Sequence, residues 1–158
     1  MAIYLQYGKI KGDVTTEGLK DWIELSSFQW GVGRGISSPA RGSKTREGSE
    51  PSISEVVVTK PLDTSSPNLF IDAVAGEMNT KAVIKFTSTI KNKVDTYLTY
   101  EMTNTGLSGY SVSSGGDRPT ESLSLNFTKM VWTFTPKAAD MTGTPDTVGY
   151  DLETMKTT

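Results

Sequence analysis

The residue types that most often perform chemistry in proteins are missing from this sequence, which has neither histidine nor cysteine. Without histidine, the chain lacks the commonest general base and the commonest metal ligand. Without cysteine, it lacks a thiolate nucleophile, a thiolate metal site and a disulfide framework. A serine–lysine dyad could still act, but no spacing in the sequence singles out one pair. We therefore expect no enzyme, no catalytic residue and no cofactor.

Two further patterns resemble binding sites but lack the context that such sites need. The glycines from Gly31 to Gly35 resemble a phosphate-binding loop, yet they lack a lysine with serine or threonine at the spacing of that motif, and no predicted helix follows them. Four carboxylates lie in or beside polar segments without the spacing of a calcium loop; they are Asp117, Glu121, Asp140 and Asp146. We predict neither a phosphate site nor a metal site.

Three tryptophans, Trp22, Trp30 and Trp132, could form an aromatic platform that stacks on a sugar. They lie within the apolar faces of predicted strands, which favours a place in the core or in an interface. A β-barrel module that binds a small ligand or a glycan is therefore kept as the alternative function.

Composition excludes several other classes of protein. The formal net charge is -2, so no overall field favours nucleic acid or an anionic membrane. No run of about 18 apolar residues exists that could insert in a membrane, and the first residues lack the features of a signal peptide. The length of 158 residues predicts one domain, 1–158, with a real core.

Alternating apolar and polar side chains predict seven strands, over residues 2–7, 20–30, 54–60, 81–91, 94–102, 107–113 and 120–135. Two of these strands change phase, near Ser26 and near Thr128 or Lys129, and a β-bulge would correct each change. A break is expected from Asn104 to Gly106 and a bulge at Gly109. The segment 148–155 could add a short edge strand.

A helix at about 66–76 is the only convincing helix pattern. We expect Ser66 as N-cap, Pro67 at the first helical position and Gly76 with a positive φ after the last turn. Apolar residues at helical spacing predict a buried stripe, namely Leu69, Phe70, Ala73 and Val74. Together with strand positions, the predicted core includes Leu69, Phe70, Val74, Phe127 and Trp132.

Many strands with one short helix predict an all-β fold, an antiparallel β-barrel flanked by that helix. A long extended loop at about 31–52 interrupts the pattern, and a loop of this length in a compact domain is usually functional or disordered. It holds four cations against two anions and almost no large apolar residue. We expect contacts between subunits or rings from this loop, at Arg34, Ile36, Arg41, Lys44, Arg46 and Glu47.

Three stretches in this order resemble a known family. They are WIELSSFQWG from Trp22 to Gly31, EVVVTK followed by DTSSPNLF between Glu55 and Phe70, and SLNFTKMVWTF from Ser124 to Phe134. The combination, which spans nearly the whole chain, is similar to Hcp, the haemolysin-coregulated tube protein of bacterial type VI secretion systems.

The resemblance implies a structural role. It implies a β-barrel protomer, a homohexameric ring with a central pore, and rings that stack into the inner tube. It further implies the trimeric spike protein, the contractile sheath and secreted effectors as partners. The protein would reside in the bacterial cytoplasm before firing and would then be secreted without a cleaved signal peptide.

Overall fold

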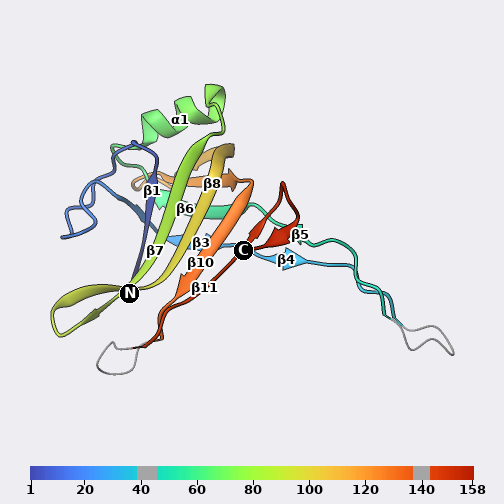
Figure 1. Ribbon diagram of the computed structural model, residues 1–158. Coiled ribbons are helices and arrows are strands. Elements are labelled where there is room, and N and C mark those ends of the chain that lie inside the picture. Colours follow the sequence, from blue (N-terminus) through green and yellow to red (C-terminus); the bar gives the residue numbers. More distant parts are fainter. Residues whose placement is uncertain (39–45, 137–142) are drawn as a thin grey trace.

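The computed structural model describes residues 1–38, 46–136 and 143–158, which form antiparallel strands and, within these ranges, a single helix (Figure 1). The helix α1 covers Ser66–Ala75. The strands are β1 (Ala2–Tyr7), β2 (Ile23–Leu25), β3 (Ser27–Gln29), β4 (Val32–Gly33), β5 (Ser52–Ile53), β6 (Val56–Pro61), β7 (Thr80–Ile90), β8 (Lys93–Ser113), β9 (Thr120–Asn126), β10 (Lys129–Phe134), β11 (Asp146–Asp151) and β12 (Lys156–Thr157). The prediction of a mainly β, antiparallel fold with one flanking helix is confirmed.

Strand pairing forms two layers that share β8. One layer has the order β12-β11-β10-β8-β7-β1-β2, and the other runs β3-β6-β9-β8. The first part of β8 pairs with β7 and β10, whereas Gly106–Ser113 pairs with β9. Strand pairing around the barrel is interrupted between β2 and β3. At this place the chain itself continues through Ser26, whose amide donates to the Thr59 carbonyl at 2.7 Å. The barrel is therefore not closed by pairing alone.

The predicted phase changes occur where the sequence places them. The strand over 20–30 breaks at Ser26, after which Phe28 and Trp30 pack against the same core as Ile23 and Leu25. The strand over 120–135 breaks between Asn126 and Lys129. The register of β8 against β9 shifts between Leu107 and Gly109, as expected for a bulge.

The predicted break from Asn104 to Gly106 is wrong, because β8 continues without interruption for 21 residues. Asn104 has a φ of 50°, so the strand bends there instead of ending. A side chain at Gly106 would approach the Met78 side chain to 2.5 Å, which explains why this position holds glycine. The residues that look like a turn in the sequence form the corner at which one strand changes layers.

The core lies between the two layers and includes Leu5, Ile23, Val58, Ile84 and Leu123, all of them fully buried. Two residues that we predicted in the core are found there or next to it. Phe127 lies within this core, and Trp132 is partly buried and packs against it.

The helix packs on this core through a narrower stripe than the sequence predicts. Leu69 is fully buried and Ala73 packs against the core, whereas Phe70 is 51% exposed and Val74 is 69% exposed. The expected burial of Phe70 and Val74 is therefore wrong. Only one ridge of so short a helix faces the sheets, so two of the four stripe residues remain in solvent.

Both predicted ends of the helix also differ from the structure. The N-cap is Ser65, and Gly76 has an extended backbone with a φ of -70° where a positive φ is predicted. The hydroxyl of Ser66 is unavailable for capping because it belongs to a buried polar network. At the other end, the Gly76 amide still donates to the Asp72 carbonyl.

This network joins α1 to β6 and β9, and its central residue is Lys60. The Lys60 ammonium, which has no solvent exposure, lies 2.5 Å from Glu121 Oε1 and 2.9 Å from Asp63 Oδ1. It also donates to Ser66 Oγ at 3.2 Å, and Ser66 Oγ donates to Glu121 Oε1 at 2.5 Å. The Tyr110 hydroxyl donates to Glu121 Oε2. The buried charges are thus paired and hydrogen-bonded, as charges in a core must be.

Burial acts to raise the pKa of Glu121, but hydrogen bonds from Lys60, Ser66 and Tyr110 outweigh it and hold that pKa below its usual value. On Tyr110, burial and the Glu121 carboxylate raise the pKa to about 12. At neutral pH the network therefore holds a charged glutamate and a neutral tyrosine.

Truncation of two neighbouring helix residues should have different effects. We expect Leu69→Ala to lower the free energy of unfolding by about 2–5 kcal/mol, since it leaves a cavity in the core. Phe70→Ala should cost only about 1 kcal/mol, because half of the ring is exposed and its aromatic contact is an edge-on approach to Tyr110. Urea denaturation of both variants measures the difference, and equal losses would contradict the orientation of α1.

The Lys60 network should make stability depend on acid pH. A glutamate whose pKa is lower in the folded state contributes stability that is full above its unfolded pKa of about 4.5. That contribution is lost as the pH falls from there through the folded pKa. We expect the melting temperature of Glu121→Gln to depend less on pH below 4.5 than that of the wild type. Parallel curves for the two proteins would show that Glu121 does not titrate in this way.

Removing the Lys60 cation alone should strongly lower the free energy of unfolding. Lys60→Met leaves Glu121 and Asp63 buried without their counter-ion, and we expect a loss of about 3–5 kcal/mol in the free energy of unfolding. Lys81→Met, on the exposed outer side of β7, serves as the matched control. A variant that unfolds like this control would mean that the carboxylates find other partners.

Candidate functional site

The predicted loop at 31–52 is a hairpin that projects away from the sheets (Figure 1). We call residues 31–38 and 46–54 the arm. Its two chains pair at Val32 with Ile53 and at Gly33 with Ser52, and a further bridge joins Ile36 to Gly48. The described part of the loop is therefore a two-stranded ribbon, held at its root by β4 and β5.

Serine hydroxyls reinforce the arm at three levels along its length. Ser54 Oγ accepts from the Gly31 amide and donates to the Gly31 carbonyl, both at 2.9 Å. Ser49 does the same with Gly35, at 2.9 and 3.2 Å. Nearer the tip, Ser37 Oγ accepts from the Glu47 amide at 2.9 Å. These bonds satisfy backbone groups in a segment that has almost no apolar side chain to bury.

The predicted contact residues that the structure describes are all exposed on the arm, namely Arg34, Ile36, Arg46 and Glu47. Arg41 and Lys44 lie outside the described residues. The Arg34 guanidinium lies over Gly48, where an added Cβ would come within 3.0 Å of Cζ. Within the described ranges, neither Arg34 nor Arg46 has a carboxylate partner. The arm thus presents cations that its own subunit does not neutralise.

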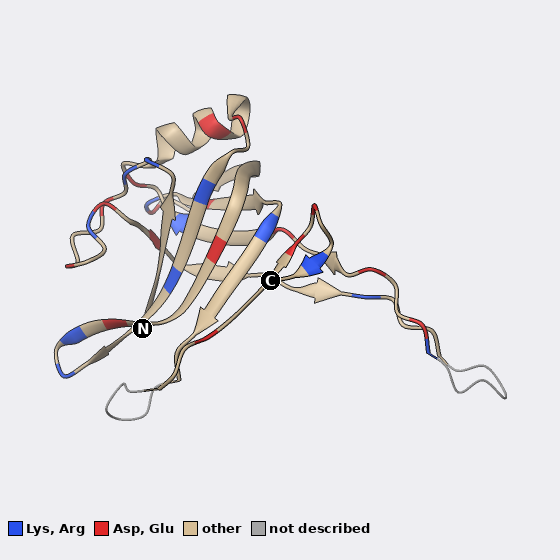
Figure 2. Ribbon diagram, viewed as in Figure 1, with Lys and Arg blue, Asp and Glu red and all other residues tan. Residues whose placement is uncertain are grey.

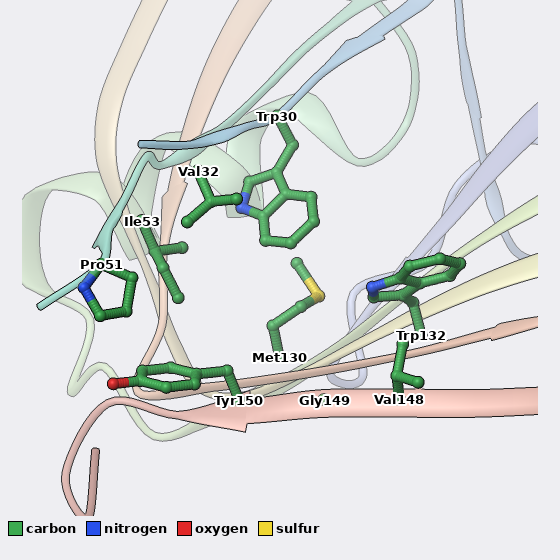
Figure 3. A pocket seen from close by; sticks show the side chains of 9 residues that line it. All are labelled: Trp30, Val32, Pro51, Ile53, Met130, Trp132, Val148, Gly149 and Tyr150. Carbon is green, nitrogen blue, oxygen red and sulfur yellow. The ribbon is translucent and has the colours of Figure 1, made fainter. Parts of the chain in front are cut away.

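An apolar pocket of about 230 Å³ lies at the base of the arm, between the arm and strands β10 and β11 (Figure 3). Val32, Pro51 and Ile53 form one wall, and Trp30, Met130, Trp132, Val148, Gly149 and Tyr150 complete the lining. The Trp30 indole Nε1 is buried and donates to no acceptor within the described part of the chain. The pocket suits an apolar group, because few of its atoms could bond a polar one.

Aromatic rings extend from this pocket into the space between the layers. The Tyr100 ring lies 5.7 Å from Trp30, 6.0 Å from Trp132 and 4.9 Å from Phe28 between ring centroids. Burial raises the pKa of the Tyr100 hydroxyl. Two of the three tryptophans considered as a sugar platform therefore belong to one aromatic cluster that continues into the core.

The third tryptophan is elsewhere. Trp22 packs with Tyr4, Leu19 and Val83 in a separate small cluster, with the Lys85 ammonium 4.9 Å from its ring centre. A sugar needs many hydrogen-bonding partners, and the side chains that line the pocket at the arm offer only the Tyr150 hydroxyl and the indoles of Trp30 and Trp132. The three tryptophans do not form one platform.

No chemical centre emerges from the carboxylates that the structure describes. Glu121 belongs to the Lys60 network, and Asp140 lies outside the described residues. Across residues 1–38, 46–136 and 143–158, no group of three or more acidic residues could hold a metal ion. In the same ranges, no helix is both long and apolar enough to cross a membrane.

The sequence contained an overlooked sign of the Lys60 network. Lys60 alternates in phase with the buried Val56 and Val58, and Glu121 alternates in phase with Leu123 and Leu125. Opposite charges in phase with two apolar strand faces indicate a buried pair, provided that the two strands are neighbours. The sequence alone does not show that β6 and β9 pair.

The fold is shared with solved structures of secretion proteins. One, described as the structure of a type six secretion system protein, has 26% identity, covers 99% of both chains and gives a TM-score of 0.90. Hcp1 from Salmonella typhimurium has 22% identity, covers 100% of both chains and gives a TM-score of 0.77. Hcp1 from the E. coli EAEC 042 pathovar has 16% identity, covers 96% of this chain and 99% of its own, and gives a TM-score of 0.76.

Sequence comparison agrees with these structural matches. None of the curated proteins compared with the chain matches it significantly. The family model described as "Type VI secretion system effector, Hcp" matches residues 4–134. Since that match runs from β1 to β10 and includes the helix and the arm, the chain belongs to the Hcp family of type VI secretion system proteins.

Proposed function

We propose that this Hcp-family tube protein closes into homohexameric rings, and that the arm joins neighbouring copies as the rings stack into an inner tube. The observation that carries the proposal is the arm itself. It projects beyond both layers, exposes Val32 and Ile36, and carries two arginines, Arg34 and Arg46, that have no carboxylate partner among the described residues. Exposed apolar and charged groups on an ordered projection are typical of a surface that another molecule covers.

The shape of the protomer is compatible with rings. The arm leaves the sheets at one side of the molecule, and the partner that accepts it offers a different surface. Such an arm can be exchanged reciprocally in a two-fold dimer or can repeat head to tail, and the head-to-tail repeat gives a ring when the rotation closes. The same logic allows rings to stack, because each ring presents donors on one face and acceptors on the other.

The remaining partners and the route follow from this role. The spike protein, the contractile sheath and the effectors are the partners we propose for the assembled tube. We also propose that the protein resides in the cytoplasm before firing and is then secreted with the tube. The alternative of a glycan-binding module finds little support, because the aromatic pocket at the arm has few polar groups.

The first test is the mass of the assembly. Purified protein should elute with a light-scattering mass near six times 17.1 kDa, and negative-stain images should show rings with a central hole. A protein that stays monomeric at high micromolar concentration, with no rings, would contradict the proposal.

The arm should be needed for assembly but not for folding. We expect replacement of residues 34–50 by a short Gly-Ser turn to leave the melting temperature within a few degrees of the wild type, because none of the described residues in this range belongs to the core or packs against it. The same variant should lose stacked tubes in electron micrographs and secretion in cells. Unchanged tubes and secretion would show that the sheets make every contact.

Hydrogen exchange offers a second measurement on the intact protein. The amides of Gly35 and Ser49 are bonded only within the exposed arm, so we expect faster exchange in isolated rings than in stacked tubes. The amide of Leu5, in the buried sheet, is the internal control and should not change. Equal protection of the arm in both states would remove it from the stacking contact.

A further inference from the structure

The outer face of α1 is an apolar surface with no cover from its own subunit. Phe70, Ile71 and Val74 are 51%, 61% and 69% exposed, although a short helix normally turns such residues to the core. They lie within five positions of one another, so they form one continuous patch. We call these three residues the helix patch. Contiguous exposed apolar groups of this kind mark a surface that another molecule covers.

A hollow of about 340 Å³ adjoins the helix patch at the start of α1. Its walls are the Phe70 and Tyr110 rings, whose centres lie 5.9 Å apart, together with Leu62 and Pro67. Asp63 and Ser66 supply its polar groups. The bonds that the Asp63 carboxylate makes within the described residues all go to Oδ1. A further donor would therefore bond to Oδ2, through the 8% of this side chain that is exposed.

The charge behind this hollow is negative. Asp63 and Glu121 together carry two negative charges, and Lys60 supplies one positive charge. Arg118 donates to the carbonyl of the wall residue Leu62, but it is paired with Asp13 and so leaves this balance unchanged. The helix itself has no basic residue, as Figure 2 shows, and its one charged side chain is Asp72. An apolar hollow lined by two aromatic rings in edge-on contact, with a carboxylate at its edge, fits an arginine, which can stack on an exposed ring face and bond the carboxylate.

The arm carries a stripe of matching chemistry and spacing. Val32, Arg34 and Ile36 alternate along one chain of the arm, and all three are exposed. Side chains two residues apart on a strand are separated by about 6.6 Å. Phe70 and Val74 are one helical turn apart, and the rise over those four residues is about 6 Å. An arginine at the hollow would thus place its neighbouring isoleucine over the helix patch.

We propose that the helix patch and its adjoining hollow are the docking site for the arm of a second copy of this chain. Arg34 of that copy enters the hollow lined by Phe70 and Tyr110 and pairs with Asp63, and Ile36 of that copy covers Val74. The inference rests on the proposed function and names the surface that receives the arm. The arm of the same copy does not reach the site, since it projects on the side of the sheets away from α1 (Figure 1).

Complementary charge supports this choice of partner. Within the described residues, Arg34 has no carboxylate partner in its own subunit, and the hollow has one carboxylate more than it has cations. Each surface lacks what the other provides. Docking would also remove three exposed apolar side chains of α1 and two of the arm from water.

The absence of cysteine gives a clean test, because engineered thiols have no native competitor. We expect the double variant Ile36→Cys with Val74→Cys to form, on mild oxidation, covalent oligomers in multiples of the chain mass. A mixture of the two single variants should give a covalent dimer and nothing larger. The matched control pairs Ile36→Cys with Val148→Cys, since Val148 is also exposed but lies on β11. Equal cross-linking of both pairs, or of neither, would overturn the proposal.

The variant Phe70→Ala tests the docking site without introducing a reactive side chain. Loss of an interface aromatic at a well-packed position weakens association by roughly 30-fold or more, so the variant should form rings or tubes only at much higher concentration. Its circular dichroism spectrum must match that of the wild type, which separates assembly from folding. Wild-type rings together with normal assembly of Phe70→Ala would overturn the docking site and leave the tube function standing. A wild type that forms neither rings nor tubes would overturn both.

Discussion

One strand, β8, holds the two layers of this protein together. Its first part completes the sheet with β7 and β10, and its last eight residues complete the sheet with β9. The change of layer needs a bend at Asn104, a bulge by Gly109 and close approach of Met78 to Gly106. Since the core is the space between the layers, its width depends on this corner. The ladders need not form a closed circle, because β8 on one side and the chain through Ser26 on the other already connect the layers.

The buried Lys60 network gives the helix its orientation, and this orientation determines which residues face outward. Ser66 at the start of α1 bonds to Lys60 and Glu121, so the first turn cannot rotate without leaving charges unpaired. At the last turn, the Tyr7 hydroxyl donates to Asp72 at 2.7 Å. With both ends held, Leu69 points to the core and Phe70 points outward. Polar bonds, and not the apolar stripe alone, therefore select the face that α1 exposes.

The sequence predicted the strands well because alternation is a local property, and each buried strand face repeats every second residue. The predictions failed where contacts between residues far apart in the sequence determine the structure. Asn104 to Gly106 has the composition of a turn, but the partners of β8 keep the backbone extended. Phe70 belongs to a stripe of apolar helical spacing, but the stripe is wider than the contact with the sheets. The family resemblance rested on three separated stretches, and each of them lies in a strand or helix of the shared fold.

The arm shows how a segment without a core of its own can remain ready for a partner. Its serines bond to the backbone of the opposite chain at three levels, so much of the conformational entropy is lost when the subunit folds. Docking then orders fewer groups, and a larger share of the contact energy appears as affinity. A fully disordered loop would lose that entropy at every interface between copies in the tube. Two weak contacts at each interface, one apolar and one an ion pair, can therefore suffice for association. Because the ion pair proposed between Arg34 and Asp63 would lie at an apolar surface, its contribution should resist salt better than that of a fully exposed pair.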